Sequence, residues 1–307
     1  MIVRAGDTSL HPGWLPATGR RSWDLVVSYF GDDPNRYRSD DVIRTDAKGP
    51  KWKGLYRVLA ESSDLLDHYD YIWLPDDDLE CDPSAIERLF ESMRQYDLLL
   101  GQPALSARSY FSWCITLQNP MTRIRYVNFI ETMAPCFHSS LLLKCLPLLD
   151  GQIGGWGLDW VWPKYAGSVP DRVAVIDDAA VTHTRPFGGP NYRFFADAGF
   201  SPLEEANRNR RTHDINETCT RIDSMITRGG VKLSGTNRVG RAVIRAGYLL
   251  TIGTAYVRRK PQRWELHARL RDHLANPTEI ADHPGLFDPI SRDREIEQPA
   301  PPGMESH

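Results

Sequence analysis

The stretch DYIWLPDDDLE, residues 70–80, places a short apolar run directly before three consecutive carboxylates, Asp76, Asp77 and Asp78. Adjacent negative charges repel one another, so their place at the end of an apolar run needs an explanation. The run YIWL (71–74) predicts a buried strand that ends at the aspartates. Asp76 and Asp78 offer the oxygen ligands that a hard divalent cation prefers. The alternative is an acidic turn before the next helix.

Strands and helices alternate on both sides of this motif. WDLVVSYFG (23–31) predicts a strand, and the apolar positions of 52–69 predict a helix. Asp82 at an N-cap and Pro83 at the first helical position predict the start of the next helix, and DLLLG (97–101) predicts another strand. This alternation is typical of a parallel, doubly wound sheet, whose ligands bind beyond the carboxyl ends of the strands.

Further strands are predicted at 125–137 and 172–184, on either side of the glycine- and tryptophan-rich segment 151–162. Within that segment, Trp156 offers a flat apolar face of the kind that stacks on sugar rings. Asp159 falls in the first turn of a predicted helix, where it either acts on a ligand or only complements the helix dipole.

His183, in VTHTRPFGG, lies at the end of the last of these strands. A lone histidine is more often a hydrogen-bonded structural residue than a ligand. Here two carboxylates and a divalent cation need a further ligand, which favours the metal role. The other eight histidines show no comparable setting.

Composition limits the classes of function. The 307 residues are 41% hydrophobic and 25% charged, and the net charge of −3 with a pI near 6.3 gives no footprint for nucleic acid. The five cysteines are odd in number and form no C-x-x-C pair, which predicts reduced thiols. The first residues predict no export signal, and no run approaches the ~18 apolar residues of a membrane span. These features predict a cytoplasmic protein.

The chain is predicted to have four parts. They are an irregular leader (1–22), a catalytic domain (23–230), a basic and apolar helical extension (231–275) and a disordered tail (276–307). Within the extension, 238–263 holds seven basic residues and no acidic ones, and its glycines weaken any helix. It either docks peripherally on the inner face of an anionic membrane or packs on the catalytic domain. Co-sedimentation with anionic against neutral vesicles separates the two.

The ordered set of motifs resembles a known class of enzymes. Strand, helix and strand leading into D-x-D, then G-W-G-x-D, then a strand ending in H-T-R-P, resembles the GT-A glycosyltransferases, which use nucleotide-sugar donors. YIWLPDDDL, GQPAL, YVNFIETMAPCF and GWGLDW resemble the family called domain of unknown function 707, over roughly residues 23–200. The resemblance implies a GT-A fold: a Rossmann-like mixed α/β sheet flanked by helices, with a C-terminal helical extension.

The resemblance also implies roles for single residues. Asp76 and Asp78 match the D-x-D pair that binds Mn²⁺ or Mg²⁺ at the donor's diphosphate, with Asp77 between them. His183 matches the late metal ligand of many GT-A enzymes. Asp159 matches the acidic residue that serves as catalytic base in several inverting members. Leu158 stands where such enzymes often carry a second acid.

Other positions match donor and sugar contacts. Ser28 and Tyr29 occupy the place where GT-A proteins hold the nucleotide base, and Lys51 lies in a loop suited to donor phosphates. Gln102 and Glu131 are candidates for sugar hydroxyls, and Glu131 is the second candidate for the base. Trp156 is predicted to contact the substrate with its flat ring.

The predicted function is a metal-dependent, hexosyltransferase-like glycosyltransferase. It moves a sugar from a UDP-sugar to a hydroxyl of a glycan or lipid-linked acceptor, with Asp159 as base and inversion at the anomeric carbon. A sugar-phosphate nucleotidyltransferase needs a glycine-rich loop after the first strand, where this chain has YFGDDPNR (29–36). A degenerate GT-A domain that binds glycans or acts as a scaffold would lack the metal ligands, which are present here.

Overall fold

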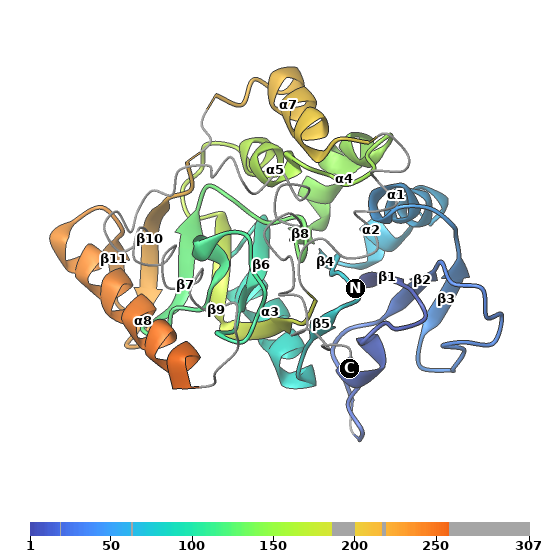
Figure 1. Cartoon of the computed structure of the whole chain (residues 1–307), viewed down its shortest axis with the longest axis horizontal. Coiled ribbons are helices and arrows are strands. Elements are labelled where there is room, and N and C mark those ends of the chain that lie inside the picture. Colours follow the sequence, from blue (N-terminus) through green and yellow to red (C-terminus); the bar gives the residue numbers. More distant parts are fainter. Residues whose placement is uncertain (19, 63, 186–199, 217–218, 258–307) are drawn as a thin grey trace, which may run out of the picture.

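The computed structural model describes residues 1–257 except 19, 63, 186–199 and 217–218 (Figure 1). A large mixed sheet runs through the molecule, and a small sheet lies at the end where β4 is found. The strands of the large sheet lie in the order β11 (Lys232–Ser234), β10 (Ile222–Thr227), β7 (Thr122–Val127), β9 (Val173–His183), β6 (Leu100–Leu105), β8 (Cys136–His138) and β4 (Tyr71–Trp73). A further short strand, β5 (Leu79–Glu80), pairs with the end of β9.

Helices flank this sheet, so the predicted α/β architecture with a mixed sheet is confirmed. Among the described strands of the large sheet, β6 and β9 are the one parallel pair, so the parallel arrangement predicted from the alternation in 23–101 does not extend to the antiparallel pairs of β4 with β8 and β8 with β6. In Figure 1, α4, α5 and α7 lie together at the top, while α3 packs on β6 and β9. The helices are α1 (Lys51–Glu61), α2 (Asp64–His68), α3 (Pro83–Gln95), α4 (Ser139–Leu149), α5 (Leu158–Ala166), α7 (Pro202–Thr212) and α8 (Arg238–Val257), with short 3₁₀ turns η1 (His11–Trp14) and η2 (Cys114–Thr116).

The small sheet corrects the prediction of an irregular leader at 1–22. Its three parallel strands are β1 (Ile2–Ala5), β2 (Val26–Tyr29) and β3 (Ile43–Asp46). All four residues of β1 are buried, including Arg4, whose guanidinium donates to the Ser28 hydroxyl and to the carbonyls of Ala47 and Gly49. A strand of four residues with a buried cation carries no hydrophobic periodicity, which is why the sequence pattern misses it.

Two further expectations need correction. The strand predicted at 125–137 is two strands, β7 and β8, joined by the loop 128–135. That loop buries Phe129, Ile130 and Ala134 without forming a strand, so its apolar character resembles a strand pattern. The single helix expected across 52–69 divides into α1 and α2. The start of α3 is confirmed, because the Asp82 carboxylate accepts from Ser84 N and Pro83 is the first helical residue.

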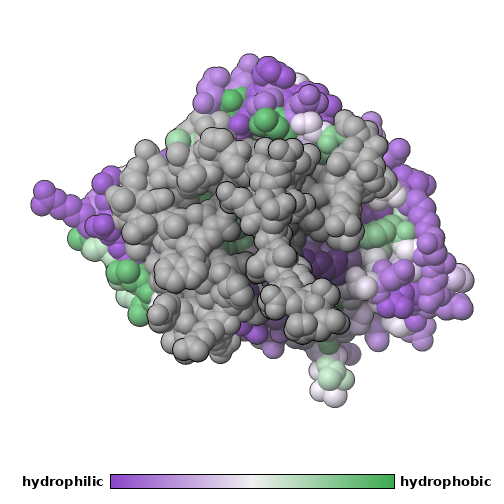
Figure 2. Space-filling view, viewed as in Figure 1, coloured by the Kyte–Doolittle hydropathy of each residue, from purple (hydrophilic) through white to green (hydrophobic). Residues whose placement is uncertain are grey.

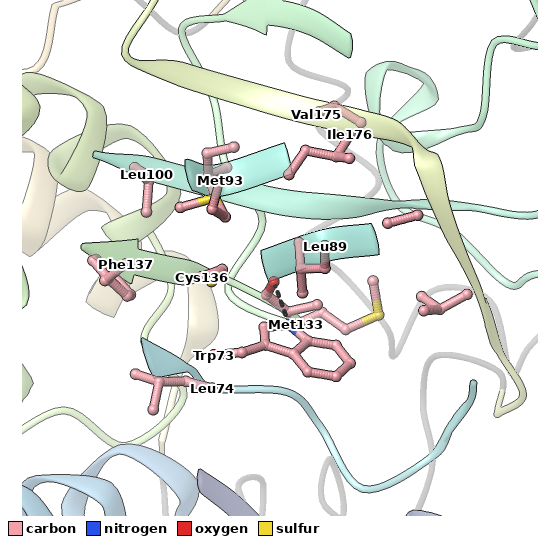
Figure 3. Packing of buried hydrophobic residues seen from close by; sticks show 14 of the residues in the cluster. Trp73, Leu74, Leu89, Met93, Leu100, Met133, Cys136, Phe137, Val175 and Ile176 are labelled. Atoms are coloured by element: carbon pink, nitrogen blue, oxygen red, sulfur yellow. Dashed lines mark hydrogen bonds between the residues drawn. The ribbon is translucent and has the colours of Figure 1, made fainter. Parts of the chain in front are cut away.

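One hydrophobic core joins the sheet to its helices (Figure 3). Leu89 and Met93 of α3 pack toward Leu100 of β6, and Trp73 of β4 donates from Nε1 to the carbonyl of Ala134 at 3.0 Å. All five cysteines lie in the described part and are free thiols, as predicted. Burial continues through Leu74 and Pro75, so the chain leaves the core where the aspartates begin.

The predicted extension contains α8, which packs on the sheet. Tyr248 is buried and its hydroxyl lies 2.7 Å from Arg125 Nη1, and the Thr251 hydroxyl donates to the carbonyl of Gln118 at 2.8 Å. The expected weakening by glycine does not interrupt α8: a Cβ on Gly247 would lie 1.8 Å from Asn119 Oδ1, so glycine permits the close approach. Membrane contact of 238–263 stays a prediction, and 258–275 and the predicted tail lie outside the described residues.

No helix in the described ranges combines the length and the apolar character that crossing a membrane would require.

The contact between α8 and the sheet depends on a buried ion pair. Arg125 and Asp177 have fully buried side chains and join through two bonds of 2.9 Å. We expect Asp177→Asn to lower the free energy of unfolding by about 3–5 kcal/mol, because it leaves Arg125 charged and uncompensated in the core. Urea denaturation measures this loss.

The neighbouring Asp178→Asn is the matched control, since Asp178 pairs with the half-exposed Arg228. It should change the stability by about 0–1 kcal/mol. Equal losses in the two variants would contradict a special role for the buried pair.

Candidate active site

The three aspartates follow β4 along the edge of the loop 128–135. Leu74 N donates to the carbonyl of Pro135, and Asp76 N donates to the carbonyl of Met133 at 2.8 Å. Beyond them, the carbonyl of Asp78 accepts from Thr184 N. The segment is therefore fixed on one side by the loop and on the other by the residues that follow β9.

Each aspartate side chain has a different partner. Asp76 Oδ1 accepts from Lys51 Nζ at 2.6 Å. Asp77 accepts from Gly6 N at 2.8 Å and faces Arg185 at 3.6 Å. Asp78 Oδ2 lies 3.4 Å from His183 Nε2. The three side chains thus have different partners, and their mutual repulsion is offset by separate cationic or N–H groups.

Pairing of β5 with β9 brings Asp78 and His183 together, because Leu79 is opposite His183 in the register. His183 Nδ1 lies 2.9 Å from the carbonyl of Tyr110, so this nitrogen carries the proton and donates, and Nε2 is directed to Asp78. Burial lowers the pKa of His183, but the hydrogen bond and charge of Asp78 outweigh it and raise the pKa to about 9.

The aspartates respond differently to this environment. Burial raises the pKa of Asp76, against the opposing charge of Lys51, and raises that of Asp77 to about 6. For Asp78 burial also acts upward, but the His183 hydrogen bond outweighs it and the pKa is lowered. Asp78 is therefore the carboxylate that stays ionised most readily, as a cation ligand must.

The fit of a divalent cation rests on Asp78. Its Oδ1 is buried and makes no hydrogen bond with any described residue, although a buried carboxylate oxygen normally has a partner. In the described ranges no three His, Cys, Asp or Glu side chains are grouped so as to hold a metal ion. Mg²⁺ is commonly bound by one or two carboxylates together with substrate phosphates, and Asp78 fits that pattern.

Asp159 lies at the start of α5, next to the same loop. Its Oδ1 accepts from Thr132 N at 2.7 Å, and its backbone carbonyl accepts from Ile130 N. Burial raises its pKa to about 6 despite the Thr132 bond. Thr132 also offers its carbonyl to Lys51 Nζ at 2.8 Å, so one residue connects Asp159 to the Lys51–Asp76 pair.

Glu131 lies in the same loop. Burial, and next the charge of Asp159, raise the pKa of Glu131 to about 8. Its backbone N–H donates to Gln102 Oε1 at 2.6 Å. Glu131 Oε2 and Gln102 Nε2 are both buried without a hydrogen bond to the described residues. Both atoms thus lack a partner within the described ranges, and contact of either with a sugar hydroxyl stays a prediction.

The other predicted residues are placed as follows. Ser28 is fully buried and its hydroxyl accepts from Arg4; Tyr29 is buried and its hydroxyl donates to Asp7. Both polar groups are therefore already bonded within the protein, and a contact of either with a nucleotide stays a prediction. Trp156 is half-buried, and its backbone N–H and carbonyl are bonded to α7.

Sequence reasoning missed two residues near this site. Arg185 faces Asp77 and is partly exposed, so it adds a cation beside the carboxylates. The sequence feature that could have identified Arg185 is the motif H-T-R-P, in which it stands two positions after His183. Glu205 of α7 accepts three backbone N–H groups from the glycine-rich loop, and nothing in the polar sequence of α7 marks it out.

An open groove with a volume of ≈ 570 Å³ lies elsewhere, between α5 and the start of β9. It contains none of the predicted site residues. Several of its charged side chains are engaged within the protein, as Arg221 is with Asp223 and Lys164 is with the carbonyl of His213. The buried carboxyl oxygens without a described partner, on Asp78 and Glu131, lie outside this groove.

Similar solved structures share little sequence with the chain. The 1–349 fragment of S. aureus TarS, in complex with UDP-GlcNAc, has 12% identity and a TM-score of 0.47, covering 71% of this chain and 66% of that one. A mycobacterial protein has 15% identity and a TM-score of 0.44, over 71% and 75% of the two chains. Glucosyl-3-phosphoglycerate synthase from Mycobacterium tuberculosis, in complex with Mn²⁺, UDP-glucose and phosphoglyceric acid, has 13% identity and a TM-score of 0.39, over 63% and 70%.

The chain thus spans just under two thirds of the TarS fragment, and none of these likenesses carries a conclusion about activity. No protein-family model and no curated protein matches the chain. The resemblance to domain of unknown function 707 therefore stays a prediction.

Proposed function

We propose that this protein is a metal-dependent glycosyltransferase of the GT-A type. It transfers a hexose-like sugar from a UDP-sugar to a hydroxyl of a glycan or lipid-linked acceptor, with inversion at the anomeric carbon. The observation that carries the proposal concerns Asp78, which lies beside His183. Its Oδ1 is buried and has no hydrogen-bond partner among the described residues. A carboxylate oxygen that is free to bind a cation, placed next to other carboxylates, suits a reaction in which a negatively charged diphosphate leaves.

Asp78 and His183 would hold Mn²⁺ or Mg²⁺, with His183 losing its Nε2 proton when it binds the ion. The bound ion would supply Lewis-acid stabilisation of the leaving diphosphate. Lys51 and Arg185 place two cations beside the aspartates, where phosphate oxygens need positive charge. When phosphate arrives, Lys51 can exchange its bond to Asp76 for a bond to the ligand, which frees Asp76 as a further oxygen ligand.

Asp159 is assigned as the base. Its pKa near 6 leaves it largely ionised at neutral pH and still able to accept a proton from an acceptor hydroxyl. Glu131, with a pKa of about 8, is largely protonated at the same pH and is suited to donate a hydrogen bond to a sugar hydroxyl. The two neighbouring carboxyl groups thus have different roles because their pKa values are separated.

A thermal-shift experiment tests donor binding. UDP at about 100 times its Kd should stabilise the folded protein by ≈ 2.7 kcal/mol, a rise in Tm of about 5–10 °C, and only when Mn²⁺ or Mg²⁺ is present. EDTA should abolish the shift, and ADP, GDP and CDP serve as nucleotide controls.

An equal shift in EDTA would contradict the metal site. Binding without turnover of any UDP-sugar would favour the degenerate, glycan-binding alternative, and release of pyrophosphate from UTP with a sugar phosphate would favour a nucleotidyltransferase.

A further inference from the structure

The glycine-rich loop before Asp159 is held by α7. Glu205 of α7 has a completely buried side chain and directs its carboxylate at the loop. Oε1 accepts from Ile153 N at 2.8 Å, and Oε2 accepts from Gly154 N at 3.1 Å and Trp156 N at 3.0 Å. Successive backbone N–H groups that converge in this way form a binding site for an anion, and here the anion belongs to the protein itself.

Asn209, one helical turn further along α7, adds to this contact. Its Nδ2 donates to the carbonyl of Trp156 at 2.7 Å, and its amide exchanges two bonds of 3.0 Å with Gln152. A Cβ on Gly157 would lie only 2.9 Å from the carbonyl of Ala206. The inner face of α7 is therefore in direct contact with the residue that precedes α5, while the surface over α7 in Figure 2 is mostly hydrophilic.

The opposite side of the loop contacts α1. Trp52 Nε1 donates to the carbonyl of Gly154 at 3.0 Å, and a Cβ on Gly155 would lie 2.1 Å from that nitrogen. Gly155 and Gly157 have φ angles of 75° and 91°, which other residues adopt only with strain. Lys51, next to Trp52, holds Asp76. The loop is thus fixed between the helix that contacts the D-x-D carboxylates and the helix that carries Glu205.

A fully buried carboxylate is costly unless it is well bonded, and this one is bonded to backbone N–H groups of the loop and not to any side chain assigned to the reaction. The last of the three residues that it bonds, Trp156, lies two residues before α5 begins at Leu158. Asp159, the second residue of α5, has its direction set by where the helix starts. The carboxylate acts on the backbone of the loop, and through it on Asp159 and on the direction of the Trp156 ring.

We infer that Glu205 is a positioning residue, which fixes the loop 153–157 so that Asp159 and Trp156 are presented to the acceptor. This inference rests on the proposed glycosyl transfer. It predicts a specific division of effects: loss of the Glu205 carboxylate impairs turnover but leaves the binding of UDP and Mn²⁺ unchanged, because Asp78 and His183 are fixed by β5 and β9.

The test compares Glu205→Gln with Glu204→Gln in the full-length protein. Both variants remove one negative charge from the first turn of α7, but Glu204 is exposed. In Glu205→Gln we expect faster hydrogen exchange of the 153–156 amides, an unchanged UDP–Mn²⁺ affinity, and a kcat for the UDP-sugar lower by about 10²-fold. The acid limb of its kcat/KM profile should move to lower pH, as Asp159 gains contact with water. Glu204→Gln should match the wild type.

Glu205→Asp keeps the charge on a shorter side chain and should retain more turnover than Glu205→Gln, which leaves the test decisive even where the glutamine variant folds poorly. Unchanged exchange, or faster exchange with wild-type kcat and pH profile, overturns the inference. A wild-type protein that neither binds UDP with Mn²⁺ nor turns over a UDP-sugar overturns the proposed function instead, and with it the role of Glu205 in positioning a base. The exchange data then still show whether Glu205 holds the loop.

Discussion

Asp78→Asn should eliminate metal-dependent turnover of the UDP-sugar, a loss of about 10³-fold or more. Asparagine keeps the shape and one oxygen but lacks the negative charge that a divalent cation needs, and Oδ1 has no described partner whose loss would otherwise disturb the fold. Lewis-acid stabilisation of a leaving group contributes several kcal/mol, and each ≈ 1.4 kcal/mol corresponds to a tenfold change in rate. Initial rates across a Mn²⁺ titration measure the effect, with the melting temperature as a check on folding.

Asp77→Asn is the matched control for Asp78. It makes the same change of charge one residue away, on a side chain that accepts from Gly6 N and faces Arg185. We expect a milder loss, because Asp77 is held by these two partners, whereas Asp78 carries, beside His183, an Oδ1 without a described partner. If Asp78→Asn binds UDP with an unchanged dependence on Mn²⁺, the assignment of the D-x-D pair is wrong.

Asp159→Asn should lower turnover by about 10²–10⁴, the usual contribution of general base catalysis, with little change in donor affinity. Asparagine can still accept the Thr132 N–H but cannot take a proton. In the wild type, the base must be deprotonated, so kcat/KM should rise with pH through about 6, the pKa of Asp159, and fall below it. A residue that only complements the helix dipole would contribute about 0.3–1 kcal/mol of stability and no pH dependence of turnover.

Glu131→Gln separates the two candidates for the base. The substitution removes the titrating proton but keeps a hydrogen-bonding group of the same size, and Gln102 can still accept from the backbone N–H of residue 131. We expect weaker sugar binding and a modest fall in kcat. Loss of turnover in Glu131→Gln with survival in Asp159→Asn would transfer the role of base to Glu131. Wild-type turnover in both would favour a retaining mechanism without an enzymatic base.

The parts of the fold and of the candidate site that depend on residues close together in the sequence could be predicted. The parts that depend on contacts between distant segments could not. The aspartates were predictable because a short apolar run and the charges after it are local features, as are the Asp82 cap and the long strand that ends at His183. Contact between Asp78 and His183 requires β5 to pair with β9, over a separation of more than a hundred residues. The sequence pattern predicts both residues as ligands but does not contain that pairing.

The misses have physical causes of the same kind. Arg4 is buried because the Ser28 hydroxyl and the carbonyls of Ala47 and Gly49, all distant in sequence, surround it, so a charged residue lies inside a strand that no hydrophobic pattern reveals. Loop 128–135 has the apolar composition of a strand because it lies over the core. Glu205 belongs to a helix rich in charge, and only its contact with the loop distinguishes it from Glu204.

The contacts of α8 determine how the chain can be divided. Arg125 donates to the Tyr248 hydroxyl in addition to Asp177, while Asn119 donates to the carbonyl of Ile244. A fragment cut after residue 230 would lose these partners and expose the sheet surface that α8 covers. The smallest recombinant piece that can keep the large sheet intact therefore extends past Thr251, and an exchange of C-terminal regions between related proteins must preserve the match between Tyr248 and Arg125.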